Sequence, residues 1–233
     1  MKKIYEEYSI SEPLFLIEQV KYKNILDIET LDIPQGKVTC ILGESGAGKS
    51  TFLRLLNKLI SPDTGEIYYM GQPLSAIDSL VLRQKVVMLM QSPVIYPGTV
   101  QYNLNFGLEI TGRTPAPENK LLETLQFLEL EKLALHGDAA TLSGGEKQRI
   151  CLGRLILMDP QVFLLDEPSA ALDENTQELI ISRLSKHVKD KGKELIMITH
   201  SGQLAKDHAE YLIYFGRDKV TAKKENINGS SSN

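Results

Sequence analysis

The chain has 233 residues, of which 42% are hydrophobic and 24% charged, and its formal net charge is −4. This length fits one large domain, or a domain with a subdomain, and the composition excludes collagen-like, disordered and disulfide-rich proteins. The mild acidity disfavours a protein whose main task is to hold nucleic acid, because neutralising phosphates requires a basic surface. We therefore expect no direct binding of nucleic acid.

The sequence carries no signal for export or membrane insertion that we recognise. Residues Met1–Glu7 are charged and contain no apolar signal segment. The longest apolar runs, such as Val86–Met90, are far shorter than the roughly 18 residues that cross a bilayer. Cys40 and Cys151 lie in separate apolar stretches, which predicts small buried side chains rather than a metal or redox pair. These features predict a cytoplasmic protein.

The first forty residues predict antiparallel strands. Short alternating segments cover Phe15–Val20 and Ile25–Ile33, and Pro34–Gly36 reads as a turn.

Beyond them, apolar runs rich in branched residues alternate with helical patterns. Helices are predicted over Ser50–Leu59 and Glu178–Lys189, with Gly192 suited to end the second. Strands buried on both faces are predicted at Val38–Leu42, Val86–Met90, Val162–Leu165, Leu195–Thr199 and Leu212–Phe215. This alternation predicts an α/β fold with a largely parallel core sheet.

Residues 92–141 depart from that rhythm, since they contain a loop at Thr111–Pro117 and a helical pattern at Asn119–Leu130. We interpret them as a helical subdomain inserted between core strands. The rest of a single domain, 1–216, then consists of the core and the antiparallel part at about 12–91 and 142–216. Residues 217–233 predict a flexible tail.

A complete phosphate-loop pattern follows the first core strand. Its glycines let backbone N–H groups wrap a polyphosphate, and the next helix adds its positive end. An accidental glycine-rich turn is the alternative, but the flanking strand and helix favour a phosphate loop; a Rossmann pattern fails because Thr51 stands where a third glycine belongs. Lys49 would reach the β- and γ-phosphates, and Ser50 would bind Mg²⁺. The candidate nucleotide-binding residues are Gly43, Glu44, Ser45, Gly46, Ala47, Gly48, Lys49, Ser50 and Thr51.

A second element ends in two acids. Val162–Leu165 runs directly into Asp166 and Glu167. Asp166 would hold Mg²⁺ and Glu167 would polarise the attacking water, whereas the alternative is a strand that ends in solvated acids. The phosphate loop favours the metal interpretation.

Leu142–Arg149 combines two signals. Ser143 and Glu146 form a capping box ahead of an apolar helix. Capping does not require Gly144 and Gly145, which would let another phosphate approach the amides at this helix start. The two interpretations are compatible.

With these segments the chain resembles the ATP-binding cassette (ABC) family of ATPases, from about Leu14 to Phe215. The similar motifs are the Walker A loop at Gly43–Ser50, the Walker B strand at Val162–Glu167, the signature at Leu142–Glu146 and the D-loop at Ala171–Asp173. Gln91 matches the Q-loop glutamine, His200 the switch histidine and Tyr22 an adenine-stacking aromatic. Ala170 stands where the family usually has serine.

The resemblance implies a P-loop NTPase of the ABC type that works as an ATP-dependent head-to-tail homodimer. Each ATP would lie between the Walker A loop of one subunit and Ser143, Gly144 and Gly145 of the other. Lys49, Glu167 and His200 would be catalytic. Ser50, Gln91 and Asp166 would face Mg²⁺.

The favoured function is the ATPase subunit of an ABC transporter with a separate transmembrane permease subunit, which would place it on the inner face of the cell membrane. An ABC ATPase acting on nucleic acid or ribosomes is the alternative; a small-molecule kinase would leave the signature without a purpose. The segment after Gln91 is similar to that of exporter-type cassettes, and the chain length resembles the FetA type, linked to iron export.

We predict that Gln91–Phe106 receives a helix of the permease, with Ile95 and Tyr96 exposed to it; the alternative is that these apolar residues pack the subdomain's own core.

Overall fold

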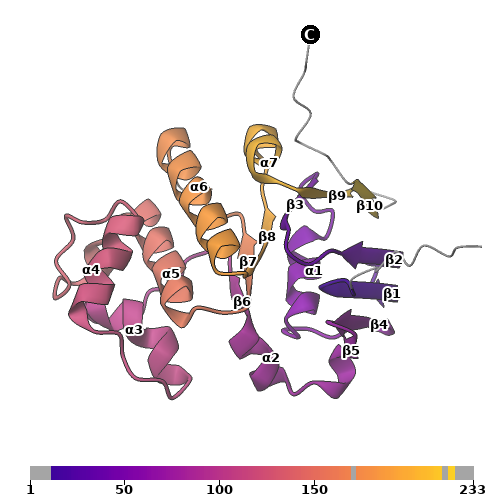
Figure 1. Cartoon of the computed structure of the whole chain (residues 1–233), viewed down its shortest axis with the longest axis horizontal. Helices are drawn as coiled ribbons and strands as arrows, with labels where there is room; N and C mark the ends of the chain where they lie inside the picture. The colour runs from indigo at the N-terminus through magenta and orange to yellow at the C-terminus, as the bar shows by residue number, and fades with distance from the viewer. Residues whose placement is uncertain (1–11, 169–171, 217–219, 224–233) are drawn as a thin grey trace, which may run out of the picture.

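The computed structural model describes residues 12–168, 172–216 and 220–223, and contains two β-sheets (Figure 1). The central sheet has the strand order β10-β9-β3-β8-β7-β6, and the second sheet has the order β2-β1-β4-β5. The central strands are β3 (Val38–Gly43), β6 (Val86–Leu89), β7 (Val162–Asp166), β8 (Glu194–Ile198), β9 (Tyr211–Phe215) and β10 (Val220–Lys223).

The central sheet is parallel from β9 to β6, as the apolar runs predict. Every residue of β7 and β8 is buried, because helices or strands cover both faces. The carboxyl ends of parallel strands meet at one edge, so the residues that follow β3, β6, β7 and β8 gather there. This edge carries the candidate site.

The second sheet is antiparallel, and its first two strands confirm the prediction for the start of the chain. Its third and fourth strands come from a segment in which we predicted no strand. The strands are β1 (Phe15–Tyr22), β2 (Leu26–Ile33), β4 (Thr64–Tyr69) and β5 (Gln72–Pro73).

Helices cover the central sheet and form a separate lobe. They are α1 (Lys49–Leu56), α2 (Ser79–Lys85), α3 (Val100–Ile110), α4 (Glu118–Phe127), α5 (Gly144–Met158), α6 (Glu174–Asp190) and α7 (Gly202–His208), with 3₁₀ turns at Leu74–Ala76 and Ala139–Thr141. Helix α1 fills the space between the two sheets, where Phe52 and Leu56 are fully buried. A second core joins the other face of the central sheet to α5, α6 and the helical lobe.

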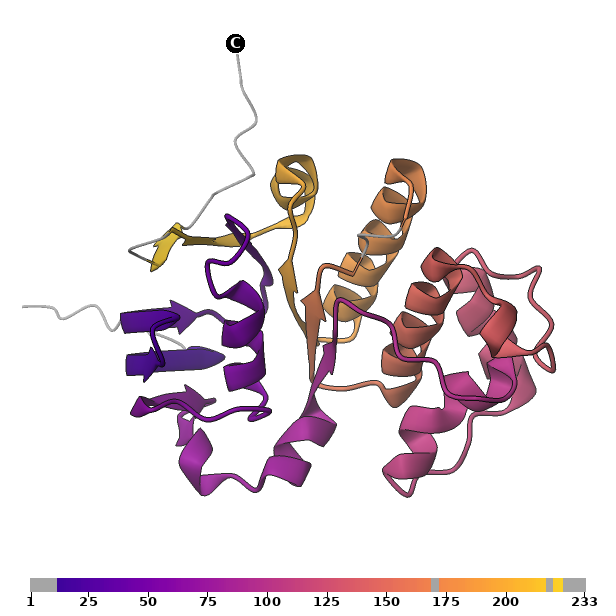
Figure 2. The ribbon, with the colours of Figure 1, turned by 180° about the vertical axis from the view of Figure 1, so that it is seen from behind.

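The inserted helices lie at the opposite end of the molecule from the antiparallel sheet (Figures 1 and 2). As predicted, α3 and α4 fall between β6 and β7. Helix α5 packs against both, and its Ile150 and Leu152 belong to the same buried cluster as Leu104 and Leu121. The lobe therefore depends on α5, which we had assigned to the core.

Several local predictions need correction or fall outside the structure. Residues 220–223 form a strand that pairs with the edge of β9, so the expectation of a flexible tail is wrong there; residues 217–219 and 224–233 lie outside the described part.

Cys40 and Cys151 are buried as predicted, and burial raises the pKa of the Cys40 thiol to about 12. No helix in the described ranges is long and apolar enough to cross a membrane.

Candidate nucleotide site

The phosphate loop joins β3 to α1, as the sequence pattern requires. Gly43 has a φ of 146°, and a Cβ there would lie 2.2 Å from the carbonyl oxygen of Phe215. Gly48 has a φ of 89° at the start of α1, where a Cβ would lie 2.6 Å from Leu26. Residues 44–46 are exposed, and 47–51 are buried or half-buried. Gly43 and Gly48 are thus required by close packing as well as by backbone conformation.

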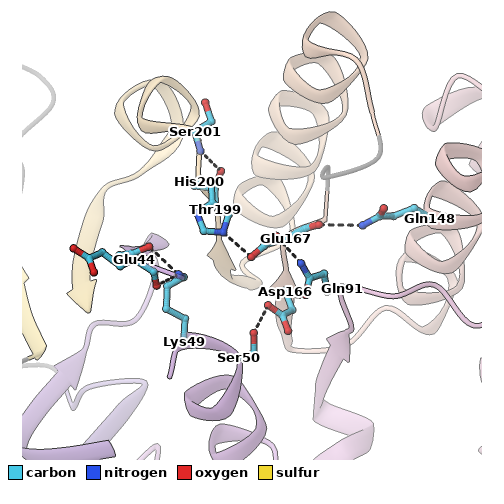
Figure 3. Close-up of polar contacts among 11 residues, drawn as sticks. Glu44, Lys49, Ser50, Gln91, Gln148, Asp166, Glu167, Thr199, His200 and Ser201 are labelled. Atoms are coloured by element: carbon cyan, nitrogen blue, oxygen red, sulfur yellow. Dashed lines mark hydrogen bonds and ion pairs between the residues drawn. The ribbon is translucent and has the colours of Figure 1, made fainter. Parts of the chain in front are cut away.

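Lys49 is folded back onto this loop. Its ammonium nitrogen donates to the carbonyl oxygens of Gly43 and Glu44, each at 2.8 Å (Figure 3). Burial lowers the pKa of Lys49, against the nearby charges of Glu167 and Asp166, which raise it. A bound phosphate would offer this amine charged acceptors in place of two carbonyls.

Asp166 and Ser50 meet across the site. The Ser50 hydroxyl donates to Oδ1 of Asp166 at 2.8 Å, and Asp166 is only 1% exposed. Burial raises the pKa of this carboxyl, although the bond from Ser50 opposes the shift. A buried carboxylate beside a hydroxyl suits Mg²⁺, which prefers oxygen ligands and completes its shell with phosphates and water. The described residues contain no group of three His, Cys, Asp or Glu that could hold a metal by themselves.

Glu167 joins the two residues that we predicted at neighbouring strand ends. Its Oε2 accepts from Nε2 of Gln91 at 2.8 Å, and its Oε1 lies 2.8 Å from Nε2 of His200 (Figure 3). The hydroxyl of Thr199 accepts from the backbone N–H of Ser201 and so fixes the turn around His200. The structure therefore brings Gln91, Glu167 and His200 together, while Gln91 as a metal ligand stays a prediction.

Gln148 is a contact that our sequence analysis missed. It lies on α5, is 2% exposed, and its Nε2 donates to the main-chain carbonyl of Glu167 at 3.0 Å. The available signal was a polar residue on the apolar, inward side of an amphipathic helix. Helical periodicity predicts that this side chain is buried, but it does not predict contact with Glu167, 19 positions later.

The signature segment starts α5. Ser143 caps this helix, and Glu146 accepts from both the hydroxyl and the backbone N–H of Ser143 at 2.7 and 2.8 Å, which confirms the capping box. The bond from the Ser143 hydroxyl lowers the pKa of Glu146. That Ser143, Gly144 and Gly145 bind the nucleotide of another subunit stays a prediction.

Tyr22 is half-buried at the end of β1, and the ammonium of Lys23 lies 5.2 Å from its ring centroid. Asp63 bonds to both neighbours of Tyr22: its N–H donates to Lys21 at 2.8 Å, and its Oδ2 accepts from the N–H of Lys23 at 2.5 Å. Ile25, in the same turn, would be 3.1 Å from a Cβ on Gly48. The turn that carries Tyr22 therefore borders the phosphate loop, although stacking on adenine stays a prediction.

The D-loop is only partly described. Ala170 and Ala171 lie outside the described residues, Leu172 packs partly buried against the core, and Asp173 caps α6 by accepting from the N–H of Thr176 at 3.0 Å.

A groove of about 500 Å³ lies beside Gln91, between α2 and α3. We call it the α2–α3 groove; its apolar lining includes Leu80, Met90, Val94, Tyr96, Phe106 and Ile110. The predicted docking segment, Gln91–Phe106, thus lies partly in this groove and partly in the core. Val100 and Leu104 are core, and Ile95 packs partly buried against that core.

Tyr96 lines the groove but is not free. Its ring stacks on Phe106 with centroids 3.8 Å apart, and the guanidinium of Arg154 lies 5.3 Å from its centroid. Ile95 and Tyr96 are both half-buried, so packing holds part of each side chain, and their contact with a permease helix stays a prediction.

Comparison with known proteins gives a consistent result. A family model described as ABC transporter matches residues 26–170. The chain is 37% identical over 177 residues to ABC transporter I family member 17 of Arabidopsis thaliana, covering 76% of this chain and 67% of that protein. It is 34% identical over 194 residues to the probable iron export ATP-binding protein FetA of Escherichia coli K12, covering 82% of this chain and 86% of FetA.

Among solved structures, the fold matches one described as the dimeric post-hydrolysis state of the ATP-binding cassette MJ0796 bound to ADP and Pi. The TM-score is 0.79, the identity is 29%, and the match covers 90% of this chain and 98% of that one. The family match extends over more than half of the chain and contains the Walker A loop, the signature and the Walker B strand. The chain belongs to the ABC transporter family and is an ATPase domain of that family.

Proposed function

We propose that this chain binds Mg-ATP and hydrolyses it to ADP and phosphate in order to drive transport through a separate membrane subunit. The observation that carries the proposal is the meeting of Ser50 with Asp166, and of Glu167 with Gln91 and His200, beside the phosphate loop.

The residues divide the work of phosphoryl transfer, in which a protein mainly positions groups and spreads charge. The loop amides and Lys49 hold the phosphates. Ser50 and Asp166 would hold Mg²⁺, which when bound neutralises charge on the phosphate oxygens. Glu167 accepts a proton from the attacking water as that water's oxygen bonds to the γ-phosphorus, and the bond to the ADP oxygen breaks. His200 holds the carboxylate of Glu167 in place.

The site of one chain is completed by a second chain. The amides at the start of α5, a helix capped by Ser143, suit a phosphate. The relative MJ0796 is described as dimeric. We propose a head-to-tail homodimer in which Ser143–Gly145 binds the nucleotide held by the other subunit.

The α2–α3 groove is the proposed seat of a short helix from the permease. It starts beside Gln91 and exposes apolar side chains, since Leu80 is 66% and Ile110 65% exposed. Exposed apolar surface of this kind marks a protein contact. Through that contact the chain would sit on the inner face of the membrane.

The cargo would be chosen by the permease. The similarity to FetA, whose name records iron export, makes export of a metal ion the first case to test. The relatives reported above are named for transport, which favours a transporter over an ATPase acting on nucleic acid or ribosomes.

Phosphate release by the purified chain with Mg-ATP tests the proposal. Lys49→Ala should remove most of this activity, because it removes the ammonium group that lies at the loop carbonyls of Gly43 and Glu44 and that would meet the phosphates. Lys132→Ala, which changes a lysine on the helical lobe, serves as the control and should leave the rate unchanged. Hydrolysis at the native rate by Lys49→Ala would contradict the proposed site.

A further inference from the structure

The main chain at Glu167 has a conformation that residues with a side chain rarely adopt. Its φ is 50°, in the left-handed region where Cβ approaches the backbone. The next residue is Pro168, which further restricts the residue before it toward extended conformations. A conformation of this kind persists only where surrounding contacts enforce it.

Two kinds of contact hold Glu167. Its carboxylate meets Gln91 and His200, and its main-chain carbonyl accepts from Nε2 of Gln148 at 3.0 Å (Figure 3). The carboxylate contacts come from side chains that are exposed, since His200 has 52% of its side chain accessible. Gln148 is 2% exposed, so its contact is made away from water and is costly to leave unmade.

Gln148 is itself held rigidly. It lies in the second turn of α5, whose apolar side chains Ile150, Cys151 and Leu152 are buried in the core shared with the helical lobe. The amide therefore stands at a fixed place beside the end of β7.

We infer that Gln148 is a positioning residue for ATP hydrolysis: by binding the carbonyl oxygen of Glu167, it keeps the main chain turned so that the carboxylate faces Gln91 and His200. The inference rests on the proposed role of Glu167 as the group that accepts the proton of water. It assigns Gln148 no contact with the nucleotide.

The position of Gln148 on α5 has a consequence for the dimer. The same helix begins with Ser143–Gly145, which is proposed to bind the nucleotide of the other subunit. Any displacement of α5 when the dimer forms would therefore reach Glu167 through Gln148.

Gln148→Met tests the inference, because methionine keeps the size of the side chain and removes the amide donor. With the full chain and Mg-ATP, we expect kcat to fall by about 100-fold, the loss typical of a misplaced catalytic group, because the carboxylate is misplaced. KM for ATP should stay within about twofold of native, because no nucleotide contact is removed.

Gln161→Met is the matched control. Its Nε2 also donates to a main-chain carbonyl, that of Gly192 at 3.2 Å, but at the opposite end of β7 from the site. It should retain native kcat and KM. If Gln148→Met does not fold, Gln148→Asn replaces it, since its amide is one methylene too short to reach Glu167.

A second readout separates positioning from general loss of stability. In the Glu167→Gln background, Gln148→Met should not lower the residual single-turnover rate further, because both changes act through the same carboxylate. A native kcat for Gln148→Met, or a full additional loss in that background, would overturn the inference. Native hydrolysis by Glu167→Gln itself would instead refute the proposed function.

Discussion

Asp166 carries a charge at a place that water hardly reaches. Burial, together with repulsion from Glu167, raises the pKa of this carboxyl in spite of the bond from Ser50 and the attraction of Arg54 and Lys49. The folded chain without a cation therefore bears a cost at this residue, which a bound Mg²⁺ would offset. The carboxylate that would hold Mg²⁺ therefore lowers the stability of the chain when no cation is bound.

Asp166→Asn should accordingly make the nucleotide-free chain more stable while abolishing hydrolysis. Relief of about 1 kcal/mol would raise Tm by about 2–4 °C in a chain of this size. The raised pKa means that the folded carboxyl binds a proton more tightly than the unfolded one, whose ordinary value is 3.8. The stability cost is therefore full above the folded pKa and disappears as the pH falls below 3.8.

Thermal unfolding across pH, followed by circular dichroism, measures this difference. The gap in Tm between variant and native chain should narrow as the pH falls. A variant that unfolds at a lower temperature than the native chain at neutral pH would contradict this view of Asp166.

Helix α5 connects more functional parts than any other described helix. Its first turn presents the signature amides, its second turn holds Gln148 against Glu167, and its apolar side completes the core of the helical lobe. Its start is fixed by the reciprocal contacts of Ser143 and Glu146.

Ser143→Ala should cost about 1 kcal/mol of stability through loss of the cap, and should also weaken ATP-driven dimerisation. Asp78→Ala is the comparison, because Asp78 caps α2 by accepting from the N–H groups of Leu80 and Val81. Denaturant unfolding should show similar losses for both variants. Sedimentation in Mg-ATP, with both changes made in the Glu167→Gln background, should show less dimer for Ser143→Ala than for Asp78→Ala. Equal dimerisation by the two variants would restrict Ser143 to capping.

The α2–α3 groove offers a separate test of partner binding. Leu80→Glu and Ile110→Glu place a charge on side chains that are more than half exposed, so they should leave folding and basal ATPase near native. They should release the chain from membranes of its own cells in a flotation assay. Leu122→Glu is the control, since Leu122 is 48% exposed on α4 and does not line the groove; release by this variant alone would place the contact elsewhere.

For the molecule as a whole, the parallel core and the phosphate loop could be predicted because buried strands and the glycine pattern are local signals. Strand β4 could not, because its pairing with β1 joins residues about fifty positions apart and Gly65 interrupts its apolar pattern. The contact of Gln148 with Glu167 and the packing of Tyr96 on Phe106 likewise depend on tertiary structure. Motif order predicted Gln91 and His200 at the site, and both contact Glu167, although either residue alone would be interpreted as a polar surface residue.

In the proposed mechanism, Glu167 completes a hydrolytic site that closes only between two chains. Glu167→Gln keeps the size of the side chain and removes the proton acceptor, so ATP should bind and remain intact. Size-exclusion chromatography with light scattering, in Mg-ATP, should then show a stable species of twice the chain mass of 26.0 kDa, with phosphate release near background. A variant that stays monomeric and hydrolyses ATP at the native rate would contradict this role of Glu167.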